Sequence, residues 1–95
     1  MATLYEATAH YQTSFKEIEP LNGTDFTLKE LYKHLECDTI EVVYFNDDTM
    51  MIIDEMGKIN DKHYNNQATY ILRDKRKTQD FIVGNAIVCK SSELT

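Results

Sequence analysis

Two short apolar runs on either side of a polar turn constrain the fold of this chain more than any other feature. Residues 40–45 and 49–53 are rich in β-branched, aromatic and methionine side chains, and Asn46-Asp47-Asp48 lies between them. Short apolar runs bounded by turn-forming residues predict β-strands, and a short polar connection predicts that they pair antiparallel. We therefore expect a β-hairpin with strands at about 39–45 and 49–54, which would form part of the core of a small domain.

The residues before the hairpin predict two strands and a helix. Apolar and polar residues alternate over 4–12, and again over 15–19 until Pro20, which cannot donate to a strand ladder. Thr27-Leu28-Lys29-Glu30 has the sequence of a helix capping box, and leucines at helical spacing follow it. A helix is therefore expected at about 27–36.

The residues after the hairpin predict a second helix and a last strand. Asn65 or Asn66 would cap a helix at about 66–75, and the apolar run that ends at Cys89 predicts a strand at about 80–89 with a buried thiol. The tail from about residue 90 is expected to be frayed. The chain is thus predicted to be one α+β domain over 1–95, with a small, mainly antiparallel sheet, two short helices and the order β-β-α-β-β-α-β.

The charge of the chain limits its classes of partner. Sixteen acidic against 10 basic residues give a formal net charge of −6. This charge disfavours binding to nucleic acid or to an anionic membrane surface, but it is compatible with docking on a basic protein surface. The acidic residues are scattered, so an ordinary solvated surface is the alternative. With neither a signal-peptide pattern nor a run of about 18 apolar residues, we expect a cytoplasmic protein.

Asp54, Glu55, Asn66 and Thr69 form the best polar constellation in the sequence. Two carboxylates at a strand end that face the start of a helix would suit a small molecule, a nucleotide or a hard cation. The alternative is that these side chains satisfy backbone groups: the acids in the turn at Gly57, and Asn66 and Thr69 at the start of the helix. We favour the second interpretation, because short polar side chains at turns usually have this role.

The sequence predicts no catalytic site, no bound metal and no cofactor. His10, His34 and His63 share no motif, and the two cysteines have no neighbours at metal-ligand spacing. Acidic residues adjoin Cys37, whereas a reactive thiol needs an electropositive setting. We therefore expect a protein that is not an enzyme.

Four residues are candidates for contact with a partner protein. Tyr5 and Tyr11 would be accessible on an edge strand, and Asp47 and Asp48 would be exposed in the hairpin turn. An uncovered sheet edge would also allow a homodimer. The basic run at 73–77 is expected to be a solvated helix end, where cations are favoured by the macrodipole.

Six segments of the chain together resemble a known family. They are 17–20 (EIEP), 26–31 (FTLKEL), 40–43 (IEVV), 54–58 (DEMGK), 66–69 (NQAT) and 82–86 (IVGNA). In order and spacing they are similar to the domain-of-unknown-function family numbered 3846. One departure is that the family has a glycine pair after the first helix, where this chain has Leu35-Glu36-Cys37-Asp38. A glycine cap is therefore missing there.

The resemblance implies a genomic context and no mechanism. Members of this family occur in phages, conjugative elements and gut bacteria that carry them, and they have no established activity. We therefore expect a non-enzymatic accessory protein of a mobile genetic element that binds a host or element protein, including a host defence factor. The alternative is a small-molecule or nucleotide-binding domain.

Overall fold

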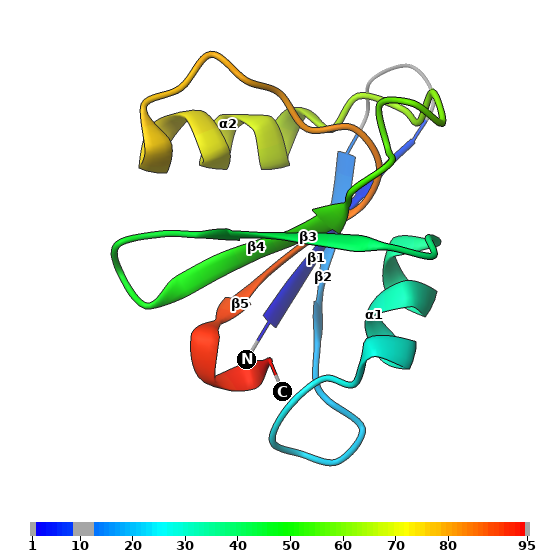
Figure 1. Cartoon of the computed structure of the whole chain (residues 1–95). Coiled ribbons are helices and arrows are strands. Elements are labelled where there is room, and N and C mark those ends of the chain that lie inside the picture. Colours follow the sequence, from blue (N-terminus) through cyan, green and yellow to red (C-terminus); the bar gives the residue numbers. More distant parts are fainter. Residues whose placement is uncertain (1, 9–12, 95) are drawn as a thin grey trace.

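The elements of the chain follow the predicted order (Figure 1). The structure is a computed structural model that describes residues 2–8 and 13–94. Its strands and helices are β1 (Ala2–Ala7), β2 (Thr13–Ile18), α1 (Leu28–Leu35), β3 (Ile40–Tyr44), β4 (Thr49–Asp54), α2 (Asn66–Arg76) and β5 (Ala86–Lys90), followed by a 3₁₀ turn at Ser91–Glu93. The predicted α+β class and element order are confirmed.

The five described strands form one antiparallel sheet in the order β2-β1-β5-β4-β3. The predicted hairpin is present, and the Phe45 amide closes its turn by donating to the Thr49 carbonyl at 2.9 Å. The predicted edge position of the first strand is wrong, because β1 lies between β2 and β5. The two edges are β2 and β3. The sequence contains no local signal that the last strand, β5, pairs with β1, so Tyr5 was expected on an edge strand.

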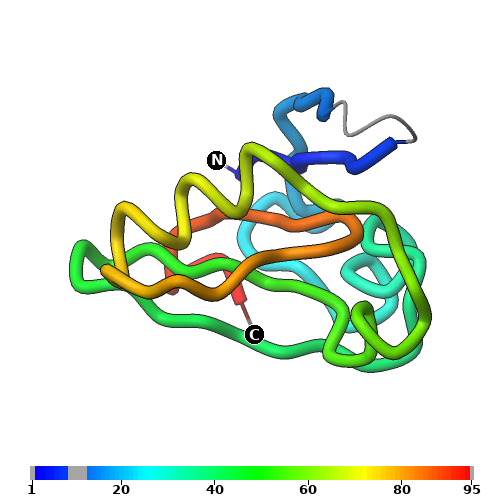
Figure 2. Tube along the Cα trace, turned by 90° about the horizontal axis from the view of Figure 1, so that it is seen from above, coloured from blue at the N-terminus to red at the C-terminus, as the bar shows by residue number. Residues whose placement is uncertain are grey.

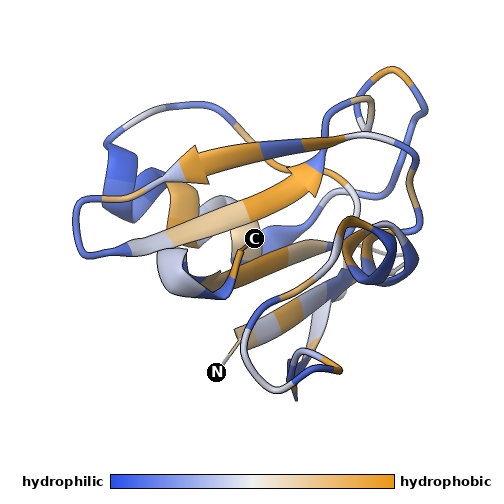
Figure 3. Ribbon diagram, turned by 60° about the horizontal axis from the view of Figure 1, so that its bottom comes forward, coloured by the Kyte–Doolittle hydropathy of each residue, from blue (hydrophilic) through white to orange (hydrophobic). Residues whose placement is uncertain are grey.

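The two helices cover opposite faces of the sheet (Figure 1). The α1 face encloses one apolar cluster, which includes Leu4, Leu31 and Ile52. The α2 face encloses a second cluster, which includes Met51 and Leu72. Apolar residues are concentrated in the strands, as their colour shows in Figure 3. Burial on both faces at about 25 cal/mol per Å² supplies most of the stabilisation of such a domain.

The predicted capping box of α1 is confirmed. Thr27 Oγ1 accepts a hydrogen bond from the Glu30 amide at 3.2 Å, and Glu30 Oε1 accepts one from the Thr27 amide at 3.0 Å. The second carboxylate oxygen of Glu30 binds the Leu21 amide at 2.8 Å. These amide hydrogen bonds lower the pKa of Glu30. Thr27 and Glu30 thus fix both the helix start and the preceding loop.

The end of α1 has no glycine cap, as the sequence shows. Glu36 itself takes the left-handed conformation, with φ 55°. The Lys62 ammonium donates to the Leu35 and Glu36 carbonyls at 3.2 and 2.7 Å, and Asn85 Nδ2 donates to the His34 carbonyl at 3.0 Å. Side chains from distant loops therefore satisfy the carbonyl groups at the end of this helix.

Asn65, and not Asn66, caps α2. Asn65 Oδ1 accepts from the Ala68 amide at 3.0 Å, and its side chain is buried. The expected capping role of Asn66 is wrong, because Asn66 is already the first helical residue and is exposed. Two adjacent asparagines have equal local capping chemistry, so the sequence alone left this choice open.

The last strand starts later than predicted, and the tail is not frayed. Residues 80–85, expected to be strand, form an irregular segment, because Gly84 has φ +79° and polar residues precede it. Beyond β5, Glu93 is buried and its carbonyl accepts a hydrogen bond from the Phe26 amide at 2.7 Å. Leu94 packs against the α1-side cluster, so residues 90–94 belong to the fold.

Candidate functional site

A groove with a volume of about 310 Å³ lies on the α2 side of β3 and β4. We call residues 78–83 the crossing segment; it reverses direction after α2, runs back alongside that helix (Figure 2) and forms the opposite wall of the groove. The floor of the groove is apolar and its rim is charged. The floor residues are Val43, Ile53, Leu72 and Ile82, and the rim residues are Glu41, Glu55, Lys58, Arg76 and Asp80.

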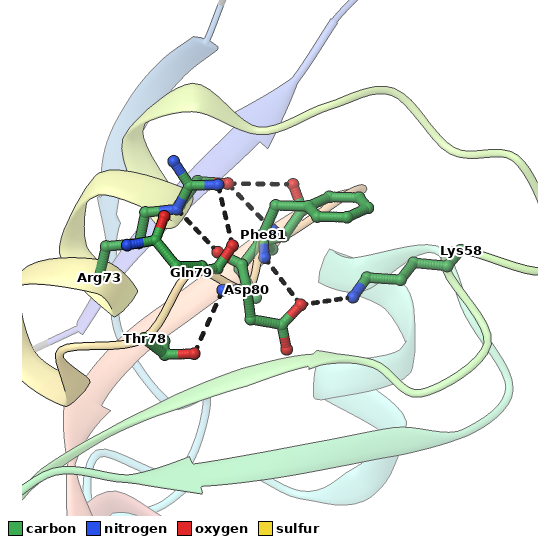
Figure 4. Close-up of polar contacts among 8 residues, drawn as sticks. Lys58, Arg73, Thr78, Gln79, Asp80 and Phe81 are labelled. Carbon is green, nitrogen blue, oxygen red and sulfur yellow. Dashed lines mark hydrogen bonds and ion pairs between the residues drawn. The ribbon is translucent and has the colours of Figure 1, made fainter.

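The crossing segment is held in place by polar contacts (Figure 4). Arg73 donates from Nε to the Asp80 carbonyl at 2.8 Å and from Nη2 to the Gln79 carbonyl at 3.1 Å. The Asp80 carboxylate pairs with Lys58 at 2.7 Å, and this hydrogen bond lowers the pKa of Asp80. Thr69 Oγ1 accepts from the Ile82 amide at 2.9 Å. Contacts within the chain itself therefore fix this wall of the groove.

An aromatic pair extends this wall. Phe81 is 38% exposed, and its ring stacks on Tyr64 with ring centroids 6.0 Å apart. The Lys58 ammonium lies 4.2 Å from the centre of the Phe81 ring. Cation and ring attract each other at this distance. Lys58 is thus engaged with both Asp80 and Phe81.

Two carboxylates on the rim have no such partner. Among residues 2–8 and 13–94, the side chains of Glu41 and Glu55 make no ion pair or hydrogen bond, and both residues are exposed. Glu41 lies opposite Ile53 in the register of the hairpin. Glu55 is therefore the diagonal cross-strand neighbour of Glu41 on the same face of the sheet. This end of the groove is therefore negatively charged.

The outer edge of β3 presents backbone groups. The Phe45 amide donates to Thr49 and the Glu55 amide to Thr39, so alternate residues of β3 point their backbone groups toward β4. Ile40, Val42 and Tyr44 therefore point theirs outward, and β4 is the sole partner of β3 among the described strands. Arg76 Nη1 donates to the Tyr44 carbonyl at 2.8 Å. The edge is thus covered at its Tyr44 end and accessible along Ile40 and Val42.

The structure does not unite the four predicted ligand residues. Asp54 and Glu55 line the groove, whereas Asn66 and Thr69 line a separate cavity on the outer side of α2. Asp54 is buried: Oδ1 accepts from the Met56 amide at 2.9 Å, and Oδ2 pairs with Lys62 at 2.8 Å. The turn-capping interpretation of Asp54 is thus confirmed. A ligand-binding role for these residues stays a prediction.

Of the predicted partner-binding residues, Tyr5 is less accessible than expected, whereas Asp47 and Asp48 are exposed as expected. Tyr5 is half-buried beside Phe15, with ring centroids 6.2 Å apart, and Tyr11 lies outside the described residues. Asp47 is exposed and accepts a hydrogen bond from Lys75, which is the main cause that lowers its pKa to about 2. Asp48 takes φ 65° in the hairpin turn, where its carbonyl accepts from the Ser91 amide at 2.9 Å.

Several residues of the groove were missed by sequence reasoning. The basic run 73–77 was expected to be solvated, yet Arg73 holds the crossing segment and Arg76 covers the β3 edge. Asp80 and Phe81 were assigned to a strand. The available signal was the polar sequence Thr78-Gln79-Asp80, which is unsuited to the centre of a sheet.

The described residues offer little else that would carry chemistry. No group of three or more histidine, cysteine, aspartate or glutamate side chains in that part of the chain is arranged to hold a metal ion. Burial raises the pKa of the Cys89 thiol to about 11, and burial followed by the charge of Asp54 raises that of Cys37. Both thiols are therefore protonated near neutral pH. Among the described residues, no helix is both long enough and apolar enough to cross a membrane.

Comparison with known families supports the resemblance seen in the sequence. The family "Domain of unknown function (DUF3846)" matches residues 8–94. The chain belongs to this family. The match covers both helices, the β3–β4 hairpin and the crossing segment, so the groove lies wholly within the family domain. No curated protein and no solved structure matches the chain.

Proposed function

We propose that this member of the family acts without catalysis, by binding a partner protein that adds an extended segment to the edge of β3. The observation that carries the proposal is the accessible backbone of Ile40 and Val42 beside a preformed groove. In strand addition, main-chain hydrogen bonds supply affinity and pockets for alternate side chains supply specificity. The β3 edge offers both features side by side.

The chemistry of the two sheet edges favours β3 over β2. Natural sheets discourage edge pairing with charged side chains, and β2 carries Lys16 and Glu17 in its exposed centre. In contrast, β3 has the sequence IEVVY, in which Glu41 is the one charged residue. The wall of the groove is already fixed by Arg73 and Lys58, so little ordering cost opposes binding.

The proposed setting rests on the genomic context expected for members of this family. The partner is a host or element protein met in the cytoplasm, and the protein is an accessory factor of a mobile genetic element, including one that acts against host defence. The net charge of −6 supports a partner with a basic surface, because opposite charge speeds and orients encounter.

The test removes the outward-facing amide of Val42. Peptides selected from a random library on the wild-type protein serve as probes, and their binding is measured to Val42→Pro and to the isosteric control Val42→Thr, which keeps the amide. Proline is tolerated on an edge strand where its missing N–H faces outward. We expect binding to be lost in Val42→Pro and kept in Val42→Thr. Circular dichroism checks that both variants fold.

Hydrogen exchange gives an independent readout on the unmodified protein. The selected peptide should slow exchange at the Ile40 and Val42 amides, which point away from β4. Binding that leaves these two amides unprotected, or that persists in folded Val42→Pro, contradicts strand addition at β3.

A second function is binding of a small molecule or nucleotide in the same groove. Its volume of about 310 Å³ lies at the lower end of the range for ligand pockets. A ligand that binds only the folded state raises the melting temperature, so a thermal-shift screen of metabolites and nucleotides tests this function. Glu55→Gln should weaken such a shift and Asn66→Ala should not, because only Glu55 lines the groove. The reverse result would place the ligand in the cavity outside α2.

A further inference from the structure

We infer that the strand added at β3 carries a lysine or arginine side chain that enters the groove at its Glu41–Glu55 end. This inference rests on the proposed function and specifies the chemistry of its partner. The two carboxylates are diagonal neighbours on one face, at the mouth of an apolar groove. The following steps give the reasons for a cation there.

The other charged side chains on the rim already have partners within the chain. Lys58 pairs with Asp80 at 2.7 Å, and Arg76 binds the Tyr44 carbonyl. Glu41 and Glu55 are the residues left without a partner among the described side chains that line the groove. Like charges that lie close together destabilise each other, and a cation between them reverses this effect.

The apolar floor suits the stem of a long basic side chain. Lysine and arginine bury their methylene groups on apolar surface while the charged end stays near water. Val43, Ile53 and Leu72 form such a surface directly inside the carboxylates. An added strand lies about 4.8 Å outside β3, and its alternate side chains stand on the α2 side of the sheet. A long side chain from that row reaches the groove, and a short one does not.

The charges also set the direction of this preference along β3. Arg76 lies at the Tyr44 end of the strand and repels a cation there, whereas Glu41 lies toward the opposite end. The basic residue of the partner is therefore expected beside Glu41. The partner position nearest Arg76 should be neutral or acidic.

The experiment uses the selected library peptides as probes. We expect them to share lysine or arginine at one position. Replacement of that residue by norleucine should weaken binding by about two- to fivefold, as expected for loss of one exposed ion pair. Glu41→Gln and Glu55→Gln should each cause a similar loss and should abolish the difference between the basic and norleucine peptides. Glu17→Gln, on the opposite edge of the sheet, is the matched control and should change nothing.

The possible outcomes separate this inference from the proposed function. Peptides that lose binding in Val42→Pro but show no basic preference, or that bind Glu41→Gln and Glu55→Gln as tightly as wild type, overturn the inference and leave strand addition intact. A library that yields no binding peptide, or only peptides that folded Val42→Pro still binds, overturns strand addition and this inference with it.

Discussion

Replacement of Asn65 by alanine tests how the fold holds the wall of the groove. The Asn65 side chain is fully buried, with 0% exposure. Besides capping α2 through Ala68, its Nδ2 donates to the Tyr5 carbonyl at 3.1 Å and to the Gly84 carbonyl at 2.9 Å. One amide thus ties the start of α2 to β1 and to the segment before β5. We expect Asn65→Ala to be strongly destabilising.

The magnitude follows from three lost hydrogen bonds. Loss of a helix N-cap costs about 1 kcal/mol. Loss of the donor to the buried Gly84 carbonyl costs a further ~1–3 kcal/mol, and loss of the donor to the part-buried Tyr5 carbonyl adds about 1 kcal/mol. The free energy of unfolding should therefore fall by about 3–5 kcal/mol. This is a large share of the total of about 5–15 kcal/mol that is typical of a single domain.

The assay is urea unfolding of Asn65→Ala beside Asn66→Ala. The adjacent Asn66 is exposed at the first position of α2, so its replacement should change the free energy of unfolding by no more than about 0.5 kcal/mol. We expect a large fall in the unfolding midpoint for Asn65→Ala alone, with a similar urea dependence. Equal costs at the two positions, or a cost at Asn65 below about 1 kcal/mol, would refute the reasoning.

Three further predictions concern charges and the end of α1. The pKa of the Asp47 carboxyl is lowered from 3.8 to about 2, so this group contributes stability that is present above pH 3.8 and lost as the pH falls toward 2. In Lys75→Ala the midpoint of the Asp47 titration, followed by NMR, should rise. An unchanged midpoint contradicts this prediction. Glu36→Gly should raise the free energy of unfolding by about 0.5–1 kcal/mol in urea unfolding, because glycine relieves the left-handed φ of 55°; a loss of stability would contradict the cap geometry. Lys62→Met should lower the free energy of unfolding by about 3 kcal/mol, because the buried Asp54 carboxylate, 2% exposed, then loses its cation. A cost below about 1 kcal/mol would show that the ion pair is dispensable.

The parts of the fold that were predicted correctly have local signals. The capping box at Thr27 and Glu30 specifies the start of α1 within four residues of sequence. The hairpin is specified by two apolar runs and the short polar turn between them. In both cases the residues that decide the structure are near neighbours in the chain, so a single sequence contains the whole signal.

The parts that were not predicted depend on contacts between distant residues. The choice between Asn65 and Asn66 depends on Tyr5 and Gly84, which are 60 and 19 residues from Asn65. The position of β1 inside the sheet depends on its pairing with β5 near the other end of the chain. The role of Arg76 depends on Tyr44, 32 residues away. Local pattern contains none of this information, because these contacts exist only after the sheet order is set.

The groove arises where the chain departs from a regular strand. A strand over 80–89 would have begun close to α2 and left no separate wall beside the hairpin. Instead, the polar residues 78–80 and the left-handed Gly84 delay β5 until Ala86, and the crossing segment passes over the α2 side of the sheet. Because β5 then pairs between β1 and β4, β3 stays at the edge. A single irregular segment therefore accounts for both the groove and the placement of an accessible strand edge next to it.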